Sequence, residues 1–464
     1  MRRMPGVAVV VCIGLLAAGC TRSDSSSEKP SDSTTSTSGG AAQTASGAFG
    51  TLENVCQPGT AKGATTIGVT DDSIHVATFS DRGFAGRPGL NQELFDSGEV
   101  FTKWCNAAGG INGRKIVLDE RDAALTNYQP KVVESCTQDL AMVGGGAVFD
   151  NTGVKDRLEC MLPDIAGFVV TPIARDSDLL VQPLPNPPGA LQIGDLKWLA
   201  KKFPASTKHI GYLTGDLQTT AIVSDQDREA AESLGFTTVY KDKYPAGGAV
   251  SWAPYVQSLK DKGVRAIMWT GEPEGLAKLE LAMADANYSV DWIRAAPNHN
   301  DPSLIDVAGP ALKNTYVWSS FVPFKDAKSS PAMQQYLDLF AKYAPDAKTK
   351  AYLGLQSWSS WLLFAQAARD CGSNLTRKCV YTTAKKIHTW TGGGLHAPTD
   401  PGANSGAGCF VVLRATPNGF VREDIDANNG IYNCSVKNNV YIVKGNNNVG
   451  ITLADVGKTM ADLK

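Results

Sequence analysis

Polar, charged and aromatic side chains gather in short loops that directly follow predicted strands. The run 80–87 follows the first strand and 147–153 the third, and further loops of this kind lie at 215–220, 271–273 and 298–300. Carboxylates, amides, hydroxyls and rings placed in this way can hold a small molecule by hydrogen bonds, charge and ring contacts. The candidate ligand-binding residues are Asp81, Arg82, Phe84, Phe149, Asp150, Asn151, Thr152, Thr171, Asp216, Thr219, Glu272, Asn298 and His299.

Several of these residues also have a structural interpretation. Any of the residues 150–152 is of a type that caps a following helix, because its side chain accepts hydrogen bonds from free N–H groups. Arg82 is alternatively a solvated loop residue, and Phe149 alternatively belongs to the core. The residue types alone leave these alternatives open.

Catalytic motifs in the sequence are absent or incomplete. No Gly-x-Ser-x-Gly run is present, so a serine hydrolase of that type lacks its nucleophile turn. Residues 457–459, Gly-Lys-Thr, resemble the end of a phosphate-binding loop, but Thr452 stands where that loop requires its first glycine. Residues 144–146, Gly-Gly-Gly, lack the rest of a dinucleotide fingerprint. We therefore expect a protein that is not an enzyme and has no cofactor, with a secreted hydrolase as the alternative.

The first twenty residues are typical of an export signal. A basic start is followed by an apolar run, residues 7–18, that is too short for a permanent membrane helix. The sequence Leu-Ala-Ala-Gly-Cys at 16–20 resembles a bacterial lipobox, so Cys20 is the candidate lipidation site; the alternative is an ordinary signal peptide with an incidental cysteine. The Ser- and Thr-rich run that follows predicts a disordered tether over 21–65. We expect an extracytoplasmic body, anchored to the cell membrane by lipid.

Eight of the ten cysteines lie beyond Cys20, and an even number in an exported chain indicates disulfides. We expect Cys371 to pair with Cys379 across a short loop, and Cys409 with Cys434 across a strand hairpin. The remaining four are expected to pair within the first lobe, in an order that the sequence leaves open: Cys56, Cys105, Cys136 and Cys160.

Metal ions and nucleic acids are not expected as partners. No Cys-x-x-Cys is present, and the five histidines have no spacing typical of a zinc site. The formal net charge is −2 and the basic residues are scattered, whereas a nucleic-acid surface needs clustered positive charge.

Short apolar strands alternate with amphipathic helices in the rest of the chain. In the first unit, the strand 74–79 precedes a helix over 94–108 whose apolar residues recur at steps of four and three. Such alternation predicts parallel sheets with helices on both faces. Four prolines between 183 and 188 interrupt it and predict a crossing between two lobes. Further strands are expected at 115–119, 141–144, 165–170, 209–214, 264–270, 291–295 and 315–321, the last returning to the first lobe. Further helices are expected around 132–140, 195–203, 220–234, 274–287, 331–343 and 352–368.

About 400 residues remain after the tether, too many for one ordinary domain. The expected fold class is α/β, with two doubly wound parallel-sheet lobes joined by hinge crossings. The expected segments are the signal peptide 1–20, the tether 21–65, the first part of lobe 1 at 66–187, lobe 2 at 188–312, the second part of lobe 1 at 313–398, and 399–464 as a return to lobe 2 with a C-terminal extension.

One block carries a family resemblance. Residues 106–116 read Asn-Ala-Ala-Gly-Gly-Ile-Asn-Gly-Arg-Lys-Ile, followed by Asp119 and Asp122, and weaker matches are Val-Gly-Gly at 143–145, Val-Thr-Pro at 170–172 and Pro-Glu-Gly at 273–275. Over about residues 74–420 the chain resembles the type I periplasmic binding proteins of the branched-chain amino-acid class. This resemblance implies a monomer that closes on a small molecule and passes it to the permease of an ABC importer. A receptor module of a sensing system is an alternative with the same residues.

The loop after the third strand departs from that family. Its members hold a ligand carboxylate with Ser and Thr hydroxyls and backbone N–H groups, whereas this chain has Phe-Asp-Asn-Thr at 149–152. If Asp150 faces the cleft it would repel a carboxylate, which favours a hydroxylated, amide-bearing or cationic ligand. The hydroxyls of Thr152 and Thr171 remain available to bind a ligand carboxylate. The aromatic side chains of Phe84 and Phe149 favour a ligand that contains a ring.

Overall fold

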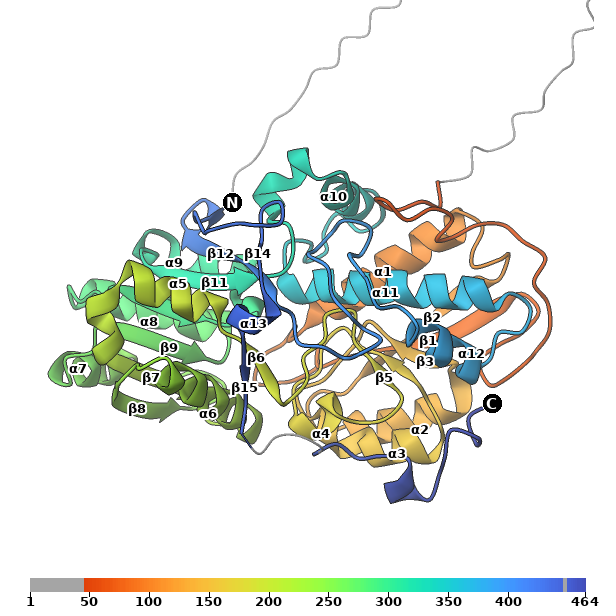
Figure 1. Cartoon of the computed structure of the whole chain (residues 1–464), viewed down its shortest axis with the longest axis horizontal. Coiled ribbons are helices and arrows are strands. Elements are labelled where there is room, and N and C mark those ends of the chain that lie inside the picture. The colour runs from red at the N-terminus through yellow and green to blue at the C-terminus, as the bar shows by residue number, and fades with distance from the viewer. Residues whose placement is uncertain (1–45, 445–448) are drawn as a thin grey trace, which may run out of the picture. The chain divides into compact units, whose positions relative to one another are not determined.

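The structure is a computed structural model that describes residues 46–444 and 449–464. The predicted signal peptide, Cys20 and the first part of the predicted tether therefore lie outside the described residues. Two main sheets, each covered by helices, form two lobes within the described chain (Figure 1).

Lobe 1 contains a parallel five-stranded sheet in the order β2-β1-β3-β4-β5. Its strands are β1 (Ser73–Ser80), β2 (Lys115–Asp122), β3 (Ala141–Val143), β4 (Asp164–Ile165) and β5 (Leu180–Val181). Its helices are α1 (Gln92–Ala107), α2 (Tyr128–Gln138), η1 (Asp150–Gly153), α3 (Val154–Glu159), α4 (Pro172–Arg175), η5 (Phe324–Ser329), α10 (Pro331–Tyr343), α11 (Tyr352–Cys371) and α12 (Arg377–Ala384). The order of elements confirms the predicted class of fold.

The core of lobe 1 is built on α11, which is buried over most of its length because it packs against both α1 and α12. The Trp361 ring stacks on Phe101 of α1 with centroids 5.3 Å apart, and Trp358 stacks on Trp104 at 5.9 Å. A helix that is apolar on nearly all sides has to lie inside the protein. α11 is such a helix, and it packs against α1 from the first part of this lobe and α12 from the second.

The predicted tether over 21–65 is wrong for residues 46–65, which pack against lobe 1. Phe49 is fully buried and lies against the rings of Trp104 and Trp358. Cys56 is joined to Cys105 of α1 by a disulfide. One aromatic anchor and one covalent bond fix a segment whose composition alone would leave it disordered.

Lobe 2 contains a mixed sheet in the order β13-β12-β11-β10-β9-β7-β8, with β14 paired to β12. The strands from β8 to β11 are parallel, and β12 and β13 are antiparallel to their neighbours. The strands are β7 (Ile210–Gly215), β8 (Thr238–Tyr244), β9 (Ala266–Thr270), β10 (Trp292–Ala295), β11 (Thr315–Ser319), β12 (Cys409–Thr416), β13 (Gly419–Arg422) and β14 (Asn433–Cys434). The helices are α5 (Gly194–Lys202), η2 (Pro204–Lys208), α6 (Gln218–Ser233), α7 (Ala253–Asp261), α8 (Pro273–Asp285), η3 (Pro297–His299), α9 (Pro302–Ala308) and η4 (Gly309–Ala311).

Strand β11 corrects the expected return to lobe 1 at residue 313. Val317 of β11 pairs with Ala295 of β10 and with Leu413 of β12, so this strand lies inside the sheet of lobe 2. The chain returns to lobe 1 only after β11. The sequence interpretation also missed β8 and α7. β8 lies at the edge of its sheet and exposes residues 241–243, so it lacks the apolar alternation of a buried strand.

The strand predicted over 165–170 pairs only at residues 164–165. Beyond it, the N–H groups of Gly167 and Phe168 both donate to the carbonyl oxygen of Gly145, and that of Val170 donates to the Asp150 carboxylate. These donors are therefore not available to a sheet ladder, and residues 167–170 form a loop.

The C-terminal part of the chain contacts both lobes. β15 (Val440–Ile442) follows α13 (Val436–Asn439) and pairs antiparallel with β6 (Ala190–Gln192), which lies between the proline-rich crossing and α5. Residues 449–464, which include η6 (Ala454–Val456), pack against lobe 1, where Leu453 and Leu463 are buried. β12 to β14 thus lie in the sheet of lobe 2, β15 pairs with β6, and the last residues lie on lobe 1.

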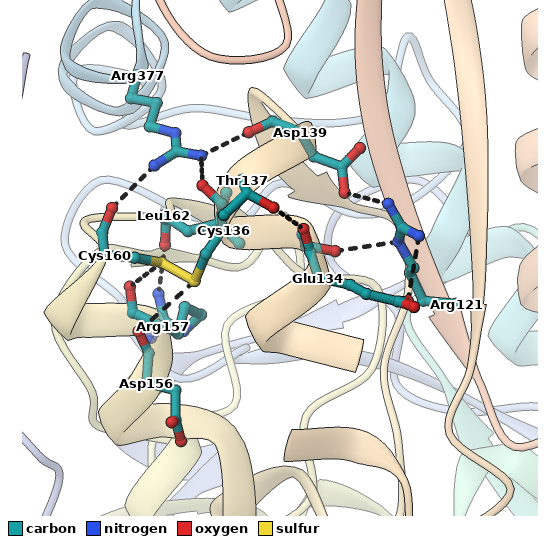
Figure 2. Close-up of a disulfide and its surroundings, with 11 residues drawn as sticks. Arg121, Glu134, Cys136, Thr137, Asp139, Asp156, Arg157, Cys160, Leu162 and Arg377 are labelled. Atoms are coloured by element: carbon teal, nitrogen blue, oxygen red, sulfur yellow. Dashed lines mark hydrogen bonds and ion pairs between the residues drawn. A yellow bond between two sulfur atoms is a disulfide. The ribbon is translucent and has the colours of Figure 1, made fainter. Parts of the chain in front are cut away.

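Four disulfides are formed among the described residues, and the two local pairs agree with the sequence-based expectation: Cys371–Cys379 and Cys409–Cys434. The four cysteines of lobe 1 pair as Cys56–Cys105 and Cys136–Cys160. Figure 2 shows the last of these beside Arg377, whose guanidinium donates to the carbonyl oxygens of Cys160, Cys136 and Asp139. Arg377 therefore ties α12 to the C-terminal ends of α2 and α3, which the disulfide joins to each other.

Candidate ligand-binding site

A cavity of about 320 Å³ lies between the two lobes. The loops after β1 and β3 and residues 167–170 reach it from lobe 1, and the loops after β7, β9 and β10 reach it from lobe 2. These are the carboxyl ends of parallel strands, where open α/β sheets bind ligands. The volume falls in the range of small-molecule sites.

Most of the exposed cavity wall is apolar. Aromatic rings come from Phe84 and Phe168 of lobe 1, from Trp318 next to the end of β11, and from Tyr352 at the start of α11. Such a wall favours a ligand with a substantial apolar part, since burial against it removes apolar surface from water.

Four of the predicted residues line this cavity: Phe84, Thr219, Glu272 and Asn298. The Thr219 hydroxyl is buried and has no hydrogen-bond partner in the described chain. Glu272 accepts from Arg87 of lobe 1 at 2.5 Å, and burial raises the pKa of Glu272 while Arg87 opposes that shift. These four residues come from both lobes.

Asp81 does not line the cavity but connects two loops beneath it. Its carboxylate is fully buried and accepts from the N–H of Leu125 at 2.8 Å and of Val148 at 2.7 Å. Burial raises the pKa of Asp81, and the two N–H donors oppose that shift. Leu125 and Val148 both lie in the cavity wall, so Asp81 affects the cavity by holding these two residues in place.

Asp150 is also absent from the cavity wall, and it does not cap the helix that follows it. Its carboxylate accepts from the Val170 N–H at 2.6 Å and from the Thr171 hydroxyl at 2.5 Å. Burial raises its pKa to about 6, although these donors oppose the shift. The carboxylate therefore anchors the loop 167–170. The Asp150 carboxylate does not face the cleft, so the predicted repulsion of a ligand carboxylate by Asp150 is wrong.

The remaining predicted residues also lie outside the cavity wall. Arg82 pairs with Glu120 at 3.2 Å, and Asp216 pairs with Lys243 at 3.0 Å. His299 is fully buried, and burial lowers its pKa to about 4, so its ring is neutral at neutral pH. Phe149 and Asn151 are half-buried, Thr152 is exposed and donates to the Phe149 carbonyl oxygen, and Thr171 donates to Asp150 and caps α4.

Sequence reasoning missed three arginines that line the cavity, namely Arg87, Arg175 and Arg294. Arg294 lies in the buried strand β10 and binds Asp195 at 2.6 Å and Asp227 at 3.0 Å. A charged residue inside an otherwise apolar strand is a signal that the sequence does contain, because a buried charge requires partners. Arg87 is the last residue of the loop 80–87. Arg175 is the last residue of a short helix, and no sequence motif marks it.

Ion pairs join the lobes beside the cavity. Arg87 of lobe 1 binds Glu272 at 2.5 Å and Glu274 at 2.8 Å, both from lobe 2. Lys348, which precedes α11, binds Asp301 of lobe 2 at 2.5 Å and Glu93 of α1 at 3.3 Å. The two lobes are therefore in contact through charged side chains in this conformation.

Within 46–444 and 449–464, no group of three or more metal-ligating side chains comes together. None of the helices in these ranges is long and apolar enough to cross a membrane.

Two lobes, one with a parallel and one with a mixed sheet, and a cavity at the carboxyl ends of the parallel strands of both define a two-lobed solute-binding protein. The chain belongs to the periplasmic binding protein family, whose model matches residues 194–437, more than half of the chain. No match is found among curated proteins.

Solved structures agree with this family. A fatty acid ABC transporter substrate-binding protein from Thermomonospora curvata has 19% identity and a TM-score of 0.68, with 84% of this chain and 100% of that chain covered. A leucine-binding protein from Thermotoga maritima has 15% identity and a TM-score of 0.63, with 75% and 97% covered. A branched-chain amino acid ABC transporter from Thermus thermophilus with bound valine has 14% identity and a TM-score of 0.63, with 78% and 98% covered. Identities this low show the fold alone, which is the predicted type I periplasmic binding protein fold.

Proposed function

We propose that this protein captures a small solute between its lobes and delivers it to the permease of an ABC importer. The observation that carries the proposal is the cavity, whose wall comes from the strand ends of both lobes. Closure of two lobes around a ligand removes water from both sides of it, and a closed state differs in shape from an open one. A permease that binds the closed state would distinguish loaded from empty protein.

The membership in a solute-binding family and the incomplete catalytic motifs support a function without catalysis. The names of the similar structures include a fatty acid, leucine and valine. These solutes differ in charge and in length, so the type of fold leaves the ligand of this chain to be argued from its own cavity.

Released ligand provides the test. Protein that lacks residues 1–20 is purified without denaturation, unfolded, and the small molecules that it releases are identified by mass spectrometry. Calorimetric titration of each identified compound into ligand-free protein should give saturable binding, and incubation should leave the compound unchanged. Steady conversion of a bound compound to a product would overturn the proposal.

We also propose that the mature protein is a monomer anchored outside the cytoplasm through a lipid on Cys20. The support is the lipobox-like sequence at 16–20 together with the family, whose members work outside the cytoplasm. Full-length protein should fractionate with membranes and incorporate labelled fatty acid, and Cys20→Ala should lose the label. Equal labelling of both proteins would contradict the anchor.

A further inference from the structure

Arg175 is a buried charge at the boundary between the lobes. It ends α4 of lobe 1, is 2% exposed and lies in the cavity wall. Its Nη1 donates to the Asn186 side chain at 3.2 Å, and its Nη2 donates to Gln226 of lobe 2 at 3.3 Å. Its Nε has no hydrogen-bond partner in the described chain. Within the described part of the chain, the hydrogen bonds of this guanidinium go to neutral amides alone.

The other two arginines of the cavity differ from Arg175 in this respect. Arg87 and Arg294 each bind two carboxylates directly. No carboxylate of residues 46–444 and 449–464 forms an ion pair with Arg175. Asp150 and Asp227 are close enough to raise its pKa, but burial has the larger effect and lowers the pKa to about 10. Arg175 is thus protonated at neutral pH, and a buried charge without a direct counterion is costly.

Anionic groups in the cavity wall are, by contrast, already paired. Asp227 is bound by Arg294 and Glu272 by Arg87. An ammonium group on a ligand would have to compete with an arginine for either carboxylate, whereas an anion would meet Arg175 without such competition. The charge pattern therefore favours an acid over a zwitterion.

Further unpartnered donors line the same cavity. Gln182 and Gln192 are buried, and the side-chain amide nitrogen of each lacks a hydrogen-bond partner in the described chain. Buried donors are nearly always satisfied in a functional complex, so a ligand with acceptor oxygens fits them. The rest of the wall is largely apolar and includes Phe84, Phe168 and Trp318.

We propose that the ligand is a carboxylic acid with an extended apolar body and no ammonium group, whose carboxylate accepts hydrogen bonds from Arg175. This inference rests on the proposed solute-binding function and adds the chemical class of the solute. The guanidinium holds the acid at the boundary between the lobes, and the apolar wall covers the chain.

Ligand comparison on the unaltered protein is the first test. Straight-chain acids from butanoate to hexadecanoate, the matching primary alcohols, α-aminodecanoate and leucine are titrated into ligand-free protein by calorimetry. A hydrogen-bonded charge pair is expected to make the best acid bind about 10- to 100-fold more tightly than its alcohol. That acid should also bind more tightly than α-aminodecanoate and leucine. Equal binding of acid and alcohol, or preference for an amino acid, would overturn the inference.

Variants at Arg175 are the second test. Arg175→Gln should weaken binding of the acid about 10- to 100-fold and leave the alcohol within about twofold, because the alcohol has no charge to pair with the guanidinium. Arg175→Lys should retain part of the preference for the acid. The control is Arg228→Gln, which removes an arginine of α6 that lies outside the cavity wall. Circular dichroism of each variant checks folding, and the comparison on unaltered protein stands even where a variant does not fold.

The outcomes separate this inference from the function on which it rests. If leucine binds and no acid does, the solute-binding function stands and the acid class fails. If the purified protein releases no small molecule and binds none of the probes, the proposed function itself fails.

Discussion

Arg87 of lobe 1 donates to Glu272 of lobe 2 over 2.5 Å, and its second nitrogen binds Glu274 at 2.8 Å. Because Arg87 also lies in the cavity wall, the same side chain joins the lobes and contacts the space in which a ligand would sit. The conformation of the lobes and the binding of a solute should therefore depend on each other.

Arg87→Gln should shift ligand-free protein toward an open arrangement of the lobes. The variant leaves two carboxylates of lobe 2 without this cation, so the contact between the lobes loses two ion pairs. Small-angle X-ray scattering should show a larger radius of gyration for ligand-free Arg87→Gln than for the unaltered protein. The control is Lys103→Gln, which breaks an ion pair with Glu99 and a hydrogen bond to the Tyr343 carbonyl oxygen, both inside lobe 1, and should leave the radius unchanged. Identical radii for all three proteins would contradict this role of Arg87.

Glu280 provides a pH-dependent prediction. It is 4% exposed on α8 and accepts from the Thr315 hydroxyl of β11 at 2.6 Å, and burial raises its pKa from 4.5 to about 8. The folded state then keeps this proton to higher pH than the unfolded state does. The contribution of Glu280 to the free energy of unfolding therefore falls as the pH rises from about 4.5 to about 8, and levels off above that.

Glu280→Gln should remove that fall, since an amide oxygen still accepts from Thr315 but does not ionise. Urea unfolding at several pH values between 5 and 8, about the range of this titration, should give a flatter pH profile for the variant. Glu274 serves as a comparison: burial alone would raise its pKa, but the Arg87 guanidinium outweighs that effect and holds the pKa below its usual 4.5, so Glu274→Gln should leave the slope of the profile between pH 5 and 8 unchanged. Parallel profiles for Glu280→Gln and unaltered protein would mean that Glu280 is not the group that titrates.

The disulfides should differ in their effect on stability. Cys56 and Cys105 are separated by 49 positions, and Cys371 and Cys379 by 8. The loop-entropy relation gives about 4 kcal/mol for the first bond and about 2.5 kcal/mol for the second. Double serine variants of each pair, compared by urea unfolding, should lose free energy of unfolding in that order. An equal or reversed order would show that effects in the folded state outweigh loop closure.

The sequence predicted where helices and strands lie more successfully than it predicted which elements lie beside them in the fold. Apolar residues recurring at steps of three and four located α1 and α10 well, because these helices bury one stripe of side chains, and β1 was located as a short apolar run that is buried on both faces. The same pattern placed β11 in the wrong lobe, since periodicity describes a strand and does not identify the strands beside it. β8 was missed because its exposed position at the sheet edge leaves little alternation of apolar and polar residues to detect.

The site was predicted to the level of loops but not of side chains. The loops after β1, β7, β9 and β10 do reach the cavity, because the carboxyl ends of parallel strands share one edge. Residue type could not tell whether Asp81 and Asp150 face the ligand or hold the loops, since a carboxylate accepts backbone N–H groups as readily as ligand donors. Arg175 gave no signal, because its contacts lie far from it in sequence.

Residues 449–464 should stabilise lobe 1, although the strands β12 to β14 that precede them in the chain belong to lobe 2. Leu463 is 1% exposed in a cluster with Val154 and Leu158, and the Lys378 N–H donates to the carbonyl oxygen of the final residue, Lys464. Leu463→Ala removes buried apolar surface and should lower the free energy of unfolding by about 2–4 kcal/mol. Met460→Ala is the control, because Met460 is 41% exposed and should cost little. If both variants unfold at the same urea concentration as the unaltered protein, residues 449–464 make no stabilising contact with lobe 1, and the packing of Leu463 would be refuted.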